Sequence, residues 1–132
     1  MKSWHASGFA FVLFITAAAL FASQNAAVPK YDPSKEMTFK GTVEEVRDRA
    51  CPVSGSIGSH IVLKLADGST IEAHLATTKF VKAYDLVFAK GDLVEVTGTR
   101  VVFEGVETIF AREVRRGNDT FEFRDRDGKP IW

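Results

Sequence analysis

Three residues that can hold a transition-metal ion lie close together in this sequence. Cys51 is the single cysteine of the chain, and His60 and His74 are two of its three histidines. The third histidine, His5, falls in an N-terminal segment that we expect to be removed on export. Thiolate sulfur and imidazole nitrogen are typical ligands of zinc, copper and haem iron. The sequence therefore suggests a metal or haem site made by Cys51, His60 and His74.

The two histidines flank a predicted β-hairpin, and its register decides whether they can meet. A three-residue loop, 66–68, ends in a glycine, which is a common hairpin connection. This loop pairs His60 with His74, on the face away from Ile61 and Leu63. Directly opposed residues have Cβ atoms about 5 Å apart, so both imidazoles could bind one ion. A two-residue loop would place them on opposite faces, but the hydrophobic pattern disfavours that register.

Cys51 has no register in this prediction. It lies in a stretch rich in glycine and serine, residues 50–59, which we expect to be a loop that folds back toward the hairpin. The alternative is that the histidine pair is solvated and the cysteine is a small buried hydrophobe. A Cys–His nucleophile would need a third, orienting residue, and none is evident. We therefore expect a binding protein and no enzyme.

A second, weaker binding hypothesis rests on arginines in the last part of the chain. With neighbouring aromatic residues they could bind a polyanion such as nucleic acid. Acidic residues are interleaved with them, and the chain has a formal net charge of zero, which favours a solvated mixed-charge face and argues against nucleic acid. These alternative site residues are Arg112, Arg115, Arg116 and Arg124.

The first residues resemble an export signal. A basic tip precedes a short apolar run and small residues, which indicates a signal peptide over residues 1–22 with cleavage as late as Ala27 as the alternative. An uncleaved membrane anchor is the rival, although the strongly apolar part is shorter than about 18 residues. Residues 23–36 contain two prolines and predict a flexible leader. We expect the domain, residues 37–132, to work in the periplasm or outside the cell.

The domain shows the two-residue period of β-strands. The long strands have a predicted bulge near Glu44, or a bend at Gly41, and a second bulge near Gly98. They surround one short helix capped by Thr77. This order predicts a mainly β fold, a small closed OB-type barrel of five to six antiparallel strands with the helix between strands 3 and 4. We expect the phenylalanines to fill its interior: Phe39, Phe103, Phe110, Phe121 and Phe123.

Several stretches resemble a known group of domains. Residues 39–43, 90–98 and 111–117, and the ending Phe123-Arg-Asp-Arg-Asp-Gly-Lys-Pro-Ile-Trp132, are similar to small exported bacterial OB-like domains, some of them associated with magnetosome or periplasmic redox genes. The resemblance implies an OB-like fold and export, and it transfers no active site.

Together these patterns predict an exported, non-enzymatic binding module. Its ligand would be copper, zinc or haem at the Cys51, His60 and His74 site. The alternative is an adaptor that binds a periplasmic protein or an oligomer and has no metal site. Contact with a membrane is expected only if the N-terminal segment is not cleaved.

Overall fold

The structure is a computed structural model that describes residues 27–132. The predicted signal peptide lies outside these residues. No helix in the described part of the chain has the length and apolar character needed to cross a membrane.

Eight elements follow one another along the described chain. They are the 3-10 helix η1 (Pro33–Lys35), the strands β1 (Met37–Cys51), β2 (Ser56–Leu65) and β3 (Thr70–Thr77), the helix α1 (Thr78–Ala83), and the strands β4 (Leu93–Phe103), β5 (Val106–Arg116) and β6 (Asp119–Glu122).

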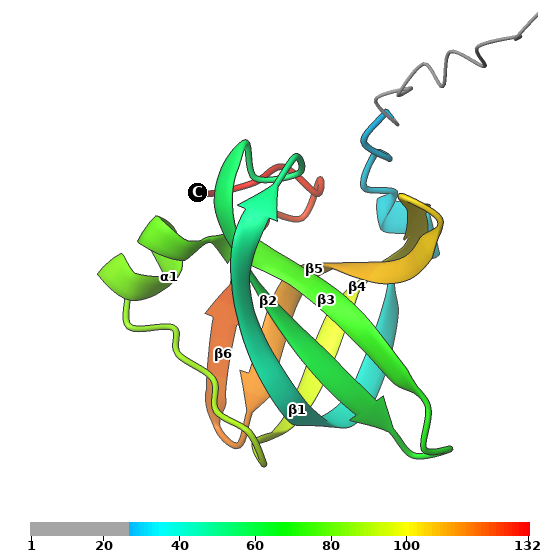
Figure 1. Cartoon of the computed structure of the whole chain (residues 1–132), viewed down its shortest axis with the longest axis vertical. Coiled ribbons are helices and arrows are strands. Elements are labelled where there is room, and N and C mark those ends of the chain that lie inside the picture. The colour runs from blue at the N-terminus through cyan, green and yellow to red at the C-terminus, as the bar shows by residue number, and fades with distance from the viewer. Residues whose placement is uncertain (1–26) are drawn as a thin grey trace, which may run out of the picture.

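Five strands close into a ring of hydrogen bonds (Figure 1). Antiparallel pairs join β3 to β2, β2 to β1, β1 to β4 and β4 to β5, and β6 extends the sheet beyond β5. The ring closes where residues 72–74 of β3 pair in parallel with residues 108–110 of β5. The fold is therefore mainly β and barrel-like, with one short helix between β3 and β4, as the sequence predicts.

Local sequence signals account for the shape of the strands and for the helix. The pairing of β1 with β2 shifts between Val43 and Glu45, and that of β4 with β5 shifts between Thr97 and Gly98. Such bulges bend a strand and increase its twist, which a small ring of long strands requires. Thr77 caps α1 by accepting a hydrogen bond from the Phe80 amide. Both predicted irregularities and the predicted cap are confirmed.

The interior of the ring is filled by alternate residues of its strands. Ile61, Leu63 and Ala73 are fully buried there, and Val81 of α1 packs against the same core. Since successive residues of a strand point to opposite faces, their neighbours along β2 and β3 point away from the interior.

A second group of buried residues packs on the outside of the ring. It consists of Cys51, His60, His74, Phe103 and Phe110, which we call the outer cluster. Phe103 and Phe110 are buried but are not part of the interior core. The expectation that all five phenylalanines fill the interior is therefore wrong for these two, because they follow the opposite phase of their strands.

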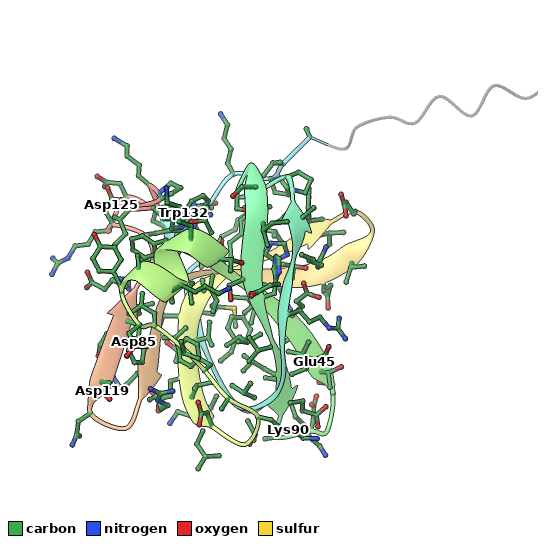
Figure 2. All side chains as sticks on the ribbon, turned by 60° about the vertical axis from the view of Figure 1, so that its left-hand side comes forward. Glu45, Asp85, Lys90, Asp119, Asp125 and Trp132 are labelled. Atoms are coloured by element: carbon green, nitrogen blue, oxygen red, sulfur yellow. The ribbon has the colours of Figure 1, made fainter. Side chains whose placement is uncertain are left out.

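The C-terminal segment covers the outer cluster. In Figure 1 it passes beside the tip of the β1–β2 hairpin, and Figure 2 shows Asp125 and Trp132 at the end of the molecule opposite to Asp119 and Lys90. The backbone of this segment folds back on itself, since the Asp125 amide donates to the Lys129 carbonyl.

Part of the segment assigned to a flexible leader also packs against the domain. Tyr31 contacts Gly128 so closely that a side chain at this glycine would overlap the tyrosine ring. Glu36, the residue after η1, forms an ion pair with Arg112 of β5. The chain from Tyr31 to Glu36 is thus tied to the domain, although its sequence is typical of a linker.

Candidate metal centre

The hairpin of β2 and β3 brings His60 and His74 together in the predicted register. His60 pairs with His74, Ile61 with Ala73, and the register shifts by one residue next to His60. His60 Nε2 lies 3.2 Å from His74 Nδ1. The two rings are nearly perpendicular, with their centroids 4.3 Å apart. The prediction that the two histidines meet on the face away from Ile61 is confirmed.

Cys51 joins the pair because β1 is longer than the sequence predicts. The predicted loop, residues 50–59, is mostly strand: β1 runs to Cys51, which pairs with Ser56 of β2. Only four residues form the turn between them, closed by a hydrogen bond from the Gly55 amide to the Cys51 carbonyl. The loop prediction was wrong because serines and glycines can be accommodated in strands when a long hairpin pairs them.

The hairpin places the cysteine against the histidines. Cys51 Sγ lies 3.3 Å from His74 Nδ1. Gly58 permits this approach, since a Cβ atom there would lie 3.0 Å from Cys51 Cβ and 3.2 Å from His60 Cε1. The sequence did not point to Gly58 as a functional residue; it pairs with Arg49, two residues before Cys51 in β1.

The three donor atoms have the spacing of ligands around one ion. One sulfur and two nitrogens, from Cys51, His60 and His74, all lie within 4.8 Å of one another. Ligands about 2.0–2.3 Å from a tetrahedral zinc ion are about 3.3–3.5 Å apart. The separations of His74 Nδ1 from His60 Nε2, 3.2 Å, and from Cys51 Sγ, 3.3 Å, are therefore close to those between zinc ligands.

All three side chains are removed from water. Cys51, His60 and His74 are 5%, 1% and 4% exposed. Burial lowers the pKa of His60, and it lowers that of His74 to about 4, with the neighbouring His60 adding to the effect. Both imidazoles are consequently neutral at neutral pH, the form that binds a metal.

A small cavity adjoins the donor atoms. Its volume is about 10 Å³, and its lining includes all three donor residues together with Arg124 and Trp132. A cavity of this size has room for about one water molecule. It can accept a single ion after slight adjustment, but the residues present do not fit a haem macrocycle, so haem is not supported as the ligand.

One nitrogen in the site lacks a partner. His60 Nδ1 is buried and makes no hydrogen bond within the described part of the chain. The other ring nitrogen, Nε2, is directed at His74. A buried polar atom without a partner is destabilising by about 1–3 kcal/mol.

The outer face of the site carries an ion-pair network. Glu72 precedes His74 by two residues and therefore lies on the same face of β3. Its carboxylate accepts a hydrogen bond of 2.6 Å from Arg49 and lies 3.5 Å from Arg47. Because both of its oxygens are occupied by arginines, Glu72 is a neighbour of the site and no fourth donor to it.

The four arginines of the alternative anion-binding hypothesis lie in different surroundings. Arg112 pairs with Glu36, and Arg116 with Asp92 at 2.9 Å. Arg124 is buried, at 7% exposure. Arg115 is exposed, so only one of the four has a free, solvated position.

The fold and the site define a barrel-like β domain with a buried group of one cysteine and two histidines on its outer face. A family comparison matches residues 35–121 to the MamS/MamX magnetosome protein family. The match covers more than half of the chain, and the protein belongs to this family. The search of curated proteins found no match.

Proposed function

We propose that this domain binds one copper or zinc ion through Cys51, His60 and His74. The observation that supports the proposal best is the convergence of three soft or borderline donor atoms within 4.8 Å, all of them buried. Thiolate and imidazole ligands favour these two metals over magnesium, calcium or manganese, which prefer oxygen ligands.

The burial of the three donor side chains also favours a bound metal ion. Three polar side chains on the outer face of a sheet would ordinarily be exposed or replaced by apolar residues, which pack there without loss of hydration. Here Phe103 and Phe110 surround His74, with ring centroids 6.2 and 5.5 Å from the imidazole. A metal ion would compensate the donors for the water that these rings exclude.

The enclosure of the site favours a binding role over a catalytic one. Catalytic zinc sites keep an open position for water or substrate, whereas structural and carrier sites are closed. The cavity of about 10 Å³ has room for one water molecule at most and none for a substrate. We therefore propose a non-enzymatic protein, exported by its N-terminal segment. The strand ring and the position of α1 support an OB-type barrel as its framework.

Metal titration of the purified full-length protein tests the proposal. Copper as Cu(I) and zinc are each titrated in competition with a chromophoric chelator, without oxygen for Cu(I). We expect one ion per chain for the wild type, and at least about a hundredfold weaker binding for His60→Ala/His74→Ala and for Cys51→Ser. Ser56→Ala is the matched control, because it alters an exposed residue that pairs with Cys51 and leaves the donors and the charges around them in place.

Equal affinities in the wild type and the donor variants would refute metal binding at this site. If a protein partner captured by the wild type is retained by His60→Ala/His74→Ala while no metal dependence is found, the adaptor function is the better explanation.

A further inference from the structure

Arg124 is a buried cation without an anionic partner among the described residues. Its Nη1 donates a hydrogen bond of 2.9 Å to the Gly128 carbonyl, and its Nε is buried without a partner. The guanidinium faces three aromatic rings, with Cζ 5.4 Å from the centroid of Tyr31, 5.6 Å from that of Phe110 and 5.8 Å from that of Trp132. Burying an arginine is unfavourable unless its charge is compensated or used.

This charge lies beside the metal site. Arg124 lines the same small cavity as Cys51, His60 and His74. The Phe110 ring lies against both the His74 imidazole and the Arg124 guanidinium, since its centroid is 5.5 Å from that of His74 and 5.6 Å from Arg124 Cζ. Both groups are buried, so their electrostatic interaction is only weakly screened.

The charge of the bound ion then decides how strongly Arg124 opposes binding. When a monovalent ion binds and the thiol releases its proton, one positive charge replaces another and the net charge of the site stays unchanged. A divalent ion that binds in the same way adds one positive charge next to Arg124. The fixed guanidinium therefore repels the divalent complex and leaves the monovalent one almost unaffected.

The number of donors also favours a monovalent copper ion over zinc. Zinc favours four ligands in a tetrahedron, and the structure supplies three protein donors beside a cavity of about 10 Å³. Cu(I) is a soft ion that thiolate ligands select, and it accepts three donors.

We propose that the site selects Cu(I), with Arg124 as the specificity-determining residue that excludes divalent ions. The inference rests on the proposed metal binding and assigns the ion. Arg124 does not touch the metal; it acts through its charge. It also explains why an arginine without a carboxylate partner is buried at this point.

A pair of variants at position 124 tests the inference in the full-length protein. Arg124→Met removes the charge and keeps a long side chain between the rings, whereas Arg124→Lys keeps the charge. We expect Arg124→Met to strengthen Zn²⁺ binding at least about tenfold and to change Cu(I) binding less than about threefold. Arg124→Lys should bind both ions like the wild type. Equal changes for both ions, or no change for Zn²⁺, would overturn the inference.

X-ray absorption spectroscopy of the wild type provides a second measurement that needs no variant at position 124. We expect Cu(I) with one sulfur and two nitrogen ligands and no oxygen. A four-coordinate Cu(I) site overturns the inference even if Arg124→Met does not fold. If His60→Ala/His74→Ala loses both metals but zinc binding does not depend on Arg124, only the choice of ion is refuted. If metal binding is unchanged in His60→Ala/His74→Ala, the metal site itself is refuted.

Discussion

Single residues of the site link its protonation to the stability of the fold. Burial lowers the pKa of His60 and lowers that of His74 to about 4, with His60 adding to the shift at His74. In the unfolded chain both imidazoles titrate near about pH 6.5. Between these values the unfolded chain takes up protons that the folded domain does not, so acid favours unfolding.

We therefore expect the free energy of unfolding of the metal-free protein to be highest above pH 6.5 and to fall as the pH is lowered toward 4. His74 alone contributes about 1.4 kcal/mol for each pH unit in this range. Urea unfolding at several pH values, after removal of metal with chelators, measures the slope. In His60→Gln/His74→Gln the slope between pH 6.5 and 5 should largely disappear. A slope as steep as that of the wild type would assign the pH dependence to other groups.

At the scale of elements, the β1–β2 hairpin assembles the site. Its pairing continues past His60 and Gly58 to Cys51, which lies opposite Ser56, although the sequence around Cys51 is rich in turn-forming residues. The hairpin can close tightly there because Gly58 has no side chain: a Cβ atom would lie 2.9 Å from Ser54 Oγ and 3.0 Å from Cys51 Cβ. The geometry of the donors therefore depends on a residue that cannot itself bind a metal.

Gly58→Ala should consequently weaken metal binding more than it weakens the fold. The added methyl group displaces Cys51 and His60 by a few tenths of an ångström, and donor sets are sensitive to shifts of about 0.5 Å. We expect about a tenfold loss of Cu(I) affinity and a stability loss of about 1–2 kcal/mol. Ser56→Ala is the control, because Ser56 pairs with Cys51 and is exposed. Unchanged affinity in Gly58→Ala would show that the hairpin tolerates the methyl group without moving the donors.

At the scale of the whole molecule, the two ends of the described chain meet over the outer cluster. Tyr31 and Trp132 both face the Arg124 guanidinium, and Glu36 pairs with Arg112. Glu36 and Arg112 are mostly buried, with side-chain exposures of 21% and 18%. An ion pair in such surroundings stabilises the fold more than an exposed one, and removal of one partner leaves a charge poorly solvated.

A chain that begins at Met37 should thus be less stable than one that begins at Ala27. The shorter chain lacks the Tyr31 ring and the Glu36 carboxylate, and we expect its midpoint of thermal unfolding to be lower by about 5–10 °C. Differential scanning calorimetry measures the difference. Glu36→Gln in the longer chain should reproduce part of it. Equal midpoints for the two chains would show that residues 27–36 do not contribute to the stability of the domain.

Much of this architecture follows from local sequence signals. The alternation of apolar residues determines the strands, Thr77 determines where α1 begins, and the loop at 66–68 determines the register that places His60 opposite His74. These are interactions between residues near in sequence, so pattern and turn chemistry are sufficient to predict them.

Tertiary structure decided the rest. The outward face of β2 and β3 is buried in part by Phe110, which the parallel pairing of β3 with β5 brings beside His74. Its burial depends equally on the C-terminal segment, which buries Arg124 over that ring. Both contacts join residues far apart in the chain, and no periodicity records them. The sequence by itself determined that His60 and His74 lie side by side. Only the closed ring of strands and the C-terminal segment that covers it bury these two residues together with Cys51. Desolvation depends on the surfaces that the whole fold brings together.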